Sequence, residues 1–219
     1  MTVVDLADRA RRFAALGDPI RLAIVDDLAA SDRSPGELGR RHDLSSNLLA
    51  HHLAVLERAG LIERAVSSGD ARRRYVRLDH EALRHLGVGV AAPAGAVLFV
   101  CTHNSARSQL AAALWSRTAG AAALSAGTHP AERVHNGAVA AAARAGLDLS
   151  GARPRHLDEV HVTPALVVTV CDRAHEELAP EPQWWHWSIP DPVDDPSTES
   201  FDHTVARLQA RIETLIGMR

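Results

Sequence analysis

The second half of the chain opens with AVLFVCTHNSARS (residues 96–108), and this stretch decides how that half folds. Its first residues form a short, continuously apolar run, which is typical of a strand buried in a parallel sheet. The polar residues that follow lead directly into a helical pattern over residues 105–119. A strand that turns straight into a helix points the N–H groups of the turn and the helix N-terminus at one place. The stretch therefore predicts an α/β fold with an oxyanion-binding loop.

Two side chains in this loop suit attack on a tetrahedral oxyanion. A cysteine attacks as its thiolate, and a helix N-terminus and a nearby cation both favour the thiolate form of Cys101. Arg107 supplies a guanidinium that can bind an oxyanion through two N–H groups. The six-residue spacing between Cys101 and Arg107 places the sulfur and the guanidinium on opposite sides of one anion. Hydrogen bonds from Asn104 and Ser108 are expected to hold the loop in shape. The alternative is a buried structural cysteine at a strand end, followed by an unrelated arginine.

Beyond this loop, short apolar runs alternate with helical patterns, which indicates an α/β domain with a parallel sheet. Strands are predicted over residues 122–125 and 166–170, and helices over residues 136–145, 155–159 and 201–216. We predict that Trp184, Trp185 and Trp187 pack in the interior rather than form a binding platform.

The first half of the chain is predicted to be mostly α-helical. Apolar residues recur at helical spacing over residues 6–28, with a break at Asp18-Pro19, a pair that caps and starts a helix. A capping box at residues 34–37 opens a short helix, and a longer helix is predicted over residues 46–59. Two segments in which apolar and polar residues alternate then predict a β-hairpin over residues 61–78. This order is that of a winged helix-turn-helix.

In such a fold the second helix of the pair enters the major groove of DNA, and the hairpin reaches along the backbone. Hydroxyl, amide and imidazole groups at the start of that helix can meet phosphates or base edges, and arginines of the hairpin can neutralise phosphates. The predicted DNA-binding residues are Ser45, Ser46, Asn47, His51, His52, Arg72, Arg73 and Arg74. The adjacent histidines diverge by about 100° on a helix, so no metal site is predicted there.

A seam rich in small residues separates the two halves. The segment RHLGVGVAAPAGA (84–96) lacks polar periodicity and contains glycines and a proline, as a linker does. We predict a DNA-binding domain over residues 1–88, a linker over residues 89–95, and an α/β domain over residues 96–219.

Charge and cysteine usage narrow the class of protein. Residues 1–90 carry 14 arginines against 13 acidic residues, and residues 91–219 carry 10 against 14, so DNA binding must rest on local patches. Two cysteines are too few for a disulfide framework, and no run of residues has the pattern of a signal peptide or a membrane span. We expect a cytoplasmic protein with reduced thiols.

Two stretches of the first half resemble the ArsR family of metalloregulatory repressors. FAALGDPIRL (13–22) is similar to that family's opening motif, and SSNLLAHHLAVLERAGL (45–61) is similar to its recognition helix. The resemblance implies a homodimer, formed through the N-terminal domain, that binds double-stranded operator DNA. The family's Cys-x-Cys inducer site is missing, because residues 31–37 contain no thiol, which excludes a soft-ligand metal site there.

Four motifs of the second half resemble, in order, the low-molecular-weight tyrosine phosphatase superfamily, and most closely its arsenate reductase branch. They are CTHNSARSQLAAALW (101–115), LSAGT (124–128), VVTVCD (167–172) and HWSIPDP (186–192). The resemblance implies that Cys101 is the nucleophile, Arg107 binds the oxyanion, and Asp191 protonates the departing oxygen. Oxyanion binding and loop support are assigned to Thr102, His103, Asn104, Ser105, Ala106, Ser108 and Ser125.

Two features favour an arsenate reductase over a tyrosine phosphatase. Phosphatases of this superfamily place aromatic residues after the Asp-Pro motif, whereas Val193-Asp194-Asp195 follows it here. A cysteine at the position of Cys171 is a trait of the reductases. A protein-tyrosine phosphatase remains the second choice of activity.

The resemblance leaves the source of electrons open. The reductases that use thioredoxin carry a further cysteine where this chain has Leu178, and another where it has Ala106. Either Cys171 resolves the Cys101–arsenate adduct, or an external thiol does so, namely mycothiol with mycoredoxin, or glutathione or thioredoxin. The missing cysteines favour the external thiol, with no bound cofactor. A further alternative is a transcriptional repressor whose second domain only senses an oxyanion or a redox change.

Overall fold

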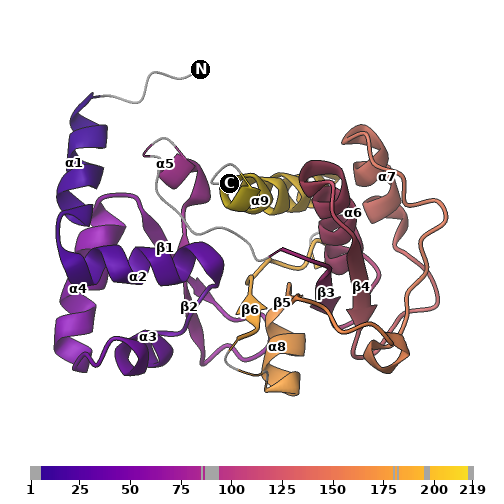
Figure 1. Ribbon diagram of the computed structural model, residues 1–219, viewed down its shortest axis with the longest axis horizontal. Helices are drawn as coiled ribbons and strands as arrows, with labels where there is room; N and C mark the ends of the chain where they lie inside the picture. Colours follow the sequence, from indigo (N-terminus) through magenta and orange to yellow (C-terminus); the bar gives the residue numbers. More distant parts are fainter. Residues whose placement is uncertain are drawn as a thin grey trace.

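The computed structural model describes residues 6–84, 86, 94–179, 181, 183–194 and 198–216, which form two lobes lying side by side (Figure 1). Within these residues, no helix has the length and apolar character needed to cross a bilayer. The predicted linker lies outside the described residues except for residues 94 and 95, so the predicted domain limits stay predictions.

The amino-terminal lobe is helical with one hairpin. Its elements are α1 (Leu6–Leu16), α2 (Pro19–Ala30), α3 (Pro35–Arg41), α4 (Ser46–Arg58), β1 (Ile62–Val66), β2 (Arg74–Leu78) and α5 (His80–Arg84). The Asp18 carboxylate accepts the N–H groups of Ile20 and Arg21, and Ser34 and Glu37 form the predicted capping box. The predicted helix-turn-helix and wing are therefore confirmed. The five-residue helix α5 was not predicted, because it is too short to show a helical period.

A continuous apolar core holds this lobe together. Residues from every helix of the lobe and from both strands contribute, among them Ile24, Leu28, Leu38, Leu53 and Leu56, all almost fully buried. Burial of one such side chain contributes about 1.5–3 kcal/mol. Strands β1 and β2 pair antiparallel, with Ile62 opposite Leu78.

The carboxy-terminal lobe is a parallel α/β structure. Its elements are β3 (Val97–Cys101), α6 (Arg107–Ala119), β4 (Ala123–Gly127), α7 (Asn136–Arg144), a 3₁₀ turn (Leu157–Glu159), β5 (Leu166–Thr169), α8 (Asp172–Leu178), β6 (Trp185–His186) and α9 (Thr198–Ile216). The sheet order is β4-β3-β5-β6, and all its pairings are parallel. The α/β prediction is confirmed. The predicted helix at 155–159 is only a 3₁₀ turn, and α8 and β6 were missed because one is mostly polar and the other is two residues long.

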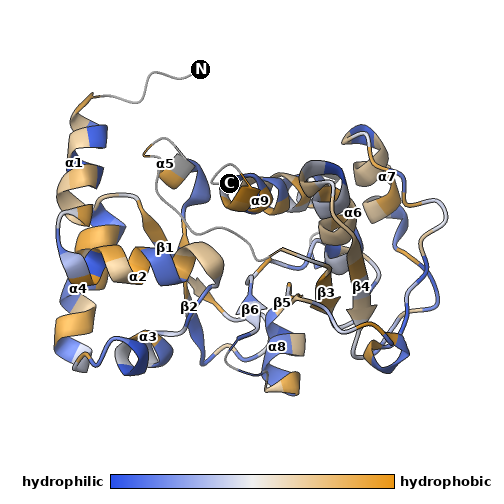
Figure 2. Cartoon of the chain, viewed as in Figure 1, coloured by the Kyte–Doolittle hydropathy of each residue, from blue (hydrophilic) through white to orange (hydrophobic). Residues whose placement is uncertain are grey.

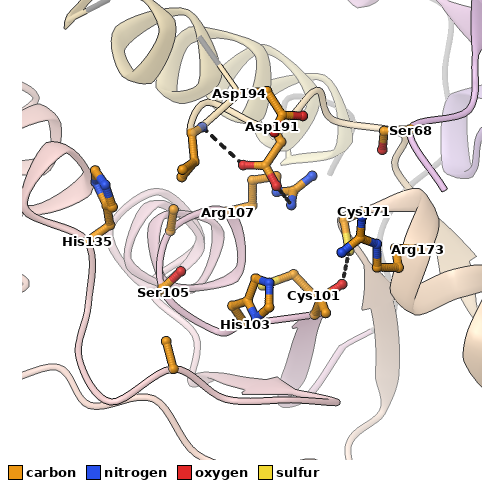
Figure 3. Close-up of a pocket in the computed structure, with 14 residues that line it drawn as sticks. Ser68, Cys101, His103, Ser105, Arg107, His135, Cys171, Arg173, Asp191 and Asp194 are labelled. Carbon is orange, nitrogen blue, oxygen red and sulfur yellow. Dashed lines mark hydrogen bonds and ion pairs between the residues drawn. The ribbon is translucent and has the colours of Figure 1, made fainter. Parts of the chain in front are cut away.

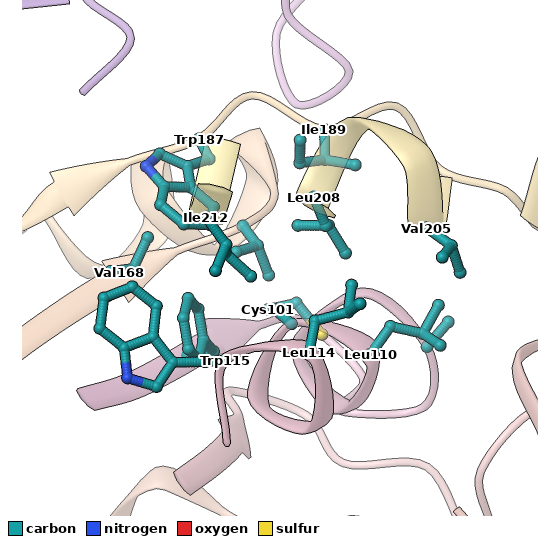
Figure 4. Close-up of a cluster of buried hydrophobic side chains, with 14 of the residues drawn as sticks. Cys101, Leu110, Leu114, Trp115, Val168, Trp187, Ile189, Val205, Leu208 and Ile212 are labelled. Atoms are coloured by element: carbon teal, nitrogen blue, oxygen red, sulfur yellow. The ribbon is translucent and has the colours of Figure 1, made fainter. Parts of the chain in front are cut away.

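Apolar side chains cover both faces of this sheet. On one face Phe99 and Trp187 pack with Trp115 and Leu110 of α6 and Leu208 of α9 (Figure 4). A smaller cluster on the other face includes Leu98 and Val100, with Trp184 against it. Trp187 is fully buried and Trp185 packs against the larger cluster, so the prediction that the tryptophans pack inside is confirmed. Figure 2 shows the contrast between the hydrophobic strand β3 and the largely hydrophilic helix α3.

Buried polar contacts join the two lobes. Arg211 of α9 pairs with Asp32, at 2.8 Å from each carboxylate oxygen, and both side chains are buried. The indole N–H of Trp187 donates to the carbonyl of Ala30 at 3.1 Å, and Arg77 of β2 donates to the Ser188 hydroxyl at 2.6 Å. Helix α5 packs along α9 (Figure 1). A buried charge without its partner is costly. The ion pair of Asp32 and Arg211 therefore stabilises this placement of the two lobes relative to each other.

Candidate active site

The site begins where β3 ends at Cys101 and the chain turns into α6 at Arg107. The Cys101 sulfur accepts the N–H of Asn104 at 3.1 Å and lies 3.0 Å from the Ser108 hydroxyl. The amide of Asn104 donates to the same hydroxyl at 2.8 Å. Asn104 has a φ of 47°, a left-handed conformation that asparagine tolerates better than most residues. The expected role of Asn104 and Ser108 in shaping the loop is thus observed.

Other segments support the loop from outside. The Asn104 side-chain oxygen accepts the N–H of Arg155 at 3.0 Å, and Gln109 donates to the Asn104 carbonyl at 3.1 Å. A Cβ atom on Gly127 would lie 2.7 Å from the carbonyl oxygen of Thr102, so only glycine lets β4 approach the loop so closely. Ser125, two residues earlier, lines a separate cavity beside α6. Its role in loop support stays a prediction, and the support that the structure shows comes from Gln109, Arg155 and Gly127.

Cys101, Arg107 and Asp191 converge on one cavity of about 410 Å³ (Figure 3). The Arg107 guanidinium lies in the first turn of α6 and donates to the Ile189 carbonyl at 3.1 Å and to the Asp191 carboxylate. The other carboxylate oxygen of Asp191 accepts the N–H of Val193 at 3.1 Å. The cavity therefore combines a nucleophile, an anion-binding cation and a carboxyl group, as attack on an oxyanion requires.

The remaining predicted loop residues lie around this cavity. Thr102, His103, Ser105 and Ala106 line it, whereas Asn104 and Ser108 act from behind the loop. The Nδ1 atom of His103 lies 3.0 Å from the carbonyl of His129.

Cys171 lines the same cavity from the end of β5. Its sulfur caps α8 by accepting the N–H of Ala174 at 3.4 Å, and it lies 3.4 Å from the Thr102 hydroxyl. Burial raises the pKa of the Cys171 thiol above its usual value. Cys171 is thus held near the nucleophile, but its environment disfavours the thiolate.

The cavity includes residues that the sequence did not single out: Ser68, Ala131, His135 and Arg173. Arg173 follows the VVTVCD motif directly, and that proximity was an available signal. Ser68 belongs to the other lobe, and nothing in its sequence surroundings points to this cavity. Among the described residues, no cluster of three or more His, Cys, Asp or Glu is placed to hold a metal ion.

The candidate DNA surface is exposed except at one position. Ser45 caps α4 by accepting the N–H of Leu48 at 3.4 Å, and Ser46, Asn47, His51, Arg72, Arg73 and Arg74 are all exposed. His52 is buried, and its ring nitrogen lies 3.8 Å from the Asp18 carboxylate. The predicted DNA contact of His52 is corrected, because its side chain turns into the lobe, about one-quarter turn around the helix from His51.

The fold and site together define a winged helix-turn-helix joined to a cysteine-loop α/β domain of the phosphatase type. The sequence model for low molecular weight phosphotyrosine protein phosphatases matches residues 96–218, more than half of the chain, and the chain belongs to that family. A helix-turn-helix domain model matches residues 16–65, and this domain is of the ArsR type. Its presence implies DNA binding, as the phosphatase-type domain implies oxyanion binding.

Solved structures similar to this chain match its carboxy-terminal lobe. A low molecular weight protein tyrosine phosphatase from T. tengcongensis is 26% identical, with a TM-score of 0.51, over 57% of this chain and 100% of its own. An arsenate reductase from Archaeoglobus fulgidus is 34% identical, with a TM-score of 0.49, over 55% of this chain and 98% of its own. Comparison with curated protein sequences gave no significant match.

Proposed function

We propose that this protein is a bifunctional arsenic-resistance protein, in which a DNA-binding transcription regulator is fused to a cysteine-dependent arsenate reductase. The convergence of Cys101, Arg107 and Asp191 on one cavity, with the thiol of Cys171 beside them, carries the proposal. Phosphotyrosine hydrolysis is the competing activity of the same family.

In the proposed reaction, arsenate binds to the N–H groups of the loop and to Arg107. The Cys101 thiolate forms a bond to arsenic, and one arsenate oxygen departs as water after Asp191 gives it a proton. An external thiolate then bonds to the Cys101 sulfur, and the electron pair of the sulfur–arsenic bond stays on arsenic, which leaves as arsenite. The two thiols are oxidised to a mixed disulfide, which a redoxin clears by thiol–disulfide exchange.

The surroundings of Cys171 support an external reductant. Attack requires a thiolate, and burial of Cys171 raises its pKa and lowers the thiolate fraction. Leu178 stands on the same short helix α8, where a relay cysteine would be needed. Retained arsenate turnover by Cys171→Ser with a small thiol would eliminate the route through Cys171.

The cavity rim supports arsenate over phosphotyrosine. Val193 and Asp194 follow the Asp-Pro motif and line the cavity, and no described residue of the lining is Phe, Tyr or Trp. The described lining therefore offers no benzene or indole ring to stack on a substrate ring, and Asp194 adds negative charge where an acidic phosphopeptide would approach.

An arsenite-release assay tests the enzyme. Wild type and Cys101→Ser are each supplied with thioredoxin and its reductase, with mycothiol and mycoredoxin, and with glutathione and glutaredoxin. We expect release by wild type with at least one small thiol and none by Cys101→Ser. Hydrolysis of p-nitrophenyl phosphate without arsenite release in any system would establish the phosphatase instead.

The regulator half of the proposal is a homodimer bound to operator DNA. Leu6 and Phe13 lie seven residues apart on α1, and 76% and 48% of their surfaces are exposed. Residues two helical turns apart share a face, so this pair offers an apolar contact for a second copy. Selection of duplexes from a random library, followed by gel shift, tests DNA binding.

A further inference from the structure

The loop at the tip of the wing, residues 67–70, is docked on α8 of the other lobe. We call this segment the wing loop. The hydroxyl of Ser67 donates to the Glu176 carboxylate at 2.7 Å. The N–H and hydroxyl of Ser68 donate to one carboxylate oxygen of Asp172 at 2.8 Å and 3.2 Å. The wing tip is therefore bound to the catalytic lobe rather than projecting freely.

The two surfaces fit closely at Gly69. A Cβ atom there would overlap the Glu176 carboxylate and lie 3.2 Å from the Cα atom of Arg173. Tyr75, in the second strand of the wing, donates its hydroxyl to Glu176 at 3.3 Å. A side chain at position 69 would therefore displace the Glu176 carboxylate and crowd the backbone of α8 at Arg173.

Asp172 joins this contact to the oxyanion cavity. Its second carboxylate oxygen lies 3.1 Å from Nε2 of the buried His186, and it directly follows Cys171 in the chain. Ser68 itself lines the cavity beside Cys171 and Arg173 (Figure 3). The DNA-binding lobe thus contributes part of the wall of the site in the other lobe.

A carboxylate of α8 beside the docked wing disfavours contact of the wing with DNA. The exposed arginines 72–74 come one residue after the wing loop, and the Glu176 carboxylate on α8 contacts Ser67 and Tyr75 of the same hairpin, so DNA held by these arginines would lie close to a negative charge. Like charges at such short range repel, and the repulsion is screened only by salt. Contact of these arginines with DNA is therefore less favourable while the wing loop lies beside Glu176.

We propose that the wing loop links the two functions: an oxyanion in the cavity favours the docked wing, whose Ser68 completes the cavity wall, and DNA favours the released wing. This inference rests on the proposed function, since it requires both an oxyanion ligand and DNA binding. A ligand shifts such an equilibrium only through its different affinity for the two states. By reciprocity, arsenate lowers the affinity for DNA by the factor by which DNA lowers the affinity for arsenate.

The link is tested by measuring DNA affinity with and without saturating arsenate, in the absence of any thiol, on a duplex selected from a random library. We expect arsenate to weaken wild-type binding by about fivefold or more. Gly69→Val crowds the Glu176 carboxylate and the backbone at Arg173, so it is expected to disfavour docking and to bind DNA with an affinity that arsenate changes by less than about twofold. The matched control is Gly151→Val, because a Cβ atom at Gly151 meets nothing within 4 Å. It is expected to behave as wild type.

A second variant, Glu176→Ala, removes the acceptor of both Ser67 and Tyr75 without adding bulk, and it is expected to weaken the effect of arsenate as Gly69→Val does. No effect of arsenate on wild type, an undiminished effect in both variants, or failure to select any duplex would each overturn the link. Arsenite release is measured in parallel. Release without any effect of arsenate on DNA affinity overturns the link alone, and an effect without release overturns the reductase alone.

Discussion

Arg211 of α9 and Asp32, which follows α2, form a buried ion pair between the two lobes, with one guanidinium nitrogen 2.8 Å from both carboxylate oxygens. Asp32 also accepts the N–H of Ser188 at 2.6 Å, within the segment that leads to Asp191. The pair therefore connects the helix-turn-helix lobe to the chain that carries the proposed acid.

Asp32→Asn is expected to lower the free energy of unfolding by about 3–5 kcal/mol, because it leaves the Arg211 charge buried without its counterion. Urea unfolding measures the change. The control is Asp202→Asn, which breaks the half-exposed pair with Arg144 and is expected to cost no more than about 1 kcal/mol. Equal losses in the two variants would contradict the assigned role of the buried pair.

Asp191→Asn is expected to reduce arsenite release by about 10²–10⁴-fold, because the amide cannot protonate the departing oxygen. Steady-state rates with a saturating small thiol measure the effect. Asp194→Asn lies in the same cavity, and neither the Arg107 contact nor the proposed proton transfer involves it. Its loss is expected to stay within about tenfold, which corresponds to about 1.4 kcal/mol.

The Cys171 thiol is expected to react slowly with iodoacetamide at neutral pH. Its pKa is raised in the folded protein, so the thiolate forms only at a higher pH than in the unfolded chain. The measurement is the alkylation rate of Cys171 against pH in Cys101→Ser, folded and in urea. A folded-state profile with its midpoint at or below that of the urea-unfolded protein would show that Cys171 is activated and would favour its attack on the adduct.

His175 is expected to make folding less stable in mild acid. Burial lowers the pKa of His175 from 6.5 to about 3, and the charge of His186, whose ring is stacked on that of His175 with 4.0 Å between the ring centroids, adds to this effect. Below pH 6.5 the unfolded chain gains a proton that the folded protein does not, so stability falls as pH falls from about 6.5 toward 3. Between pH 6 and pH 4.5 the loss approaches about 2 kcal/mol.

His175→Gln removes this proton uptake, so its unfolding free energy is expected to drop less than that of wild type over the same interval. Urea unfolding at the two pH values measures the difference. The control is His156→Gln, at a half-exposed position in the same lobe, which is expected to keep the wild-type drop.

Phe13→Glu is expected to convert a dimer to a monomer and to weaken DNA binding, because it places a charge on the exposed apolar face of α1. Light scattering after size-exclusion chromatography measures the mass. Arg11→Glu changes charge on the same helix at an already polar position and is expected to leave the dimer intact. A Phe13→Glu protein of dimeric mass would place the contact elsewhere.

Local signals predicted much of the architecture and the centre of the site. Asp18 caps α2 through N–H groups two and three residues away, and Ser34 and Glu37 satisfy each other across three residues. The apolar run before Cys101 predicted a buried strand, because its side chains are hydrophobic on both faces. In each case the deciding contacts are made within a few residues, and their spacing is visible in the chain.

His52 shows where such signals fail. It lies in a helix whose type and position were predicted correctly, yet its side chain turns into the core. The direction of a side chain depends on how the element is rotated against its neighbours, and a motif match does not specify that rotation.

The sequence by itself determined that a winged helix-turn-helix precedes a strand, cysteine loop and helix of phosphatase type, because caps, periodicity and the loop spacing are local properties. Only the tertiary structure decided that the wing loop lies on α8 and that Ser68 lines the cavity of Cys101. The Ser68 and Asp172 contact spans 104 residues. No local sequence pattern around Ser68 or Asp172 predicts that the two residues are in contact. Their contact follows from the packing of the two lobes around Asp32 and Arg211.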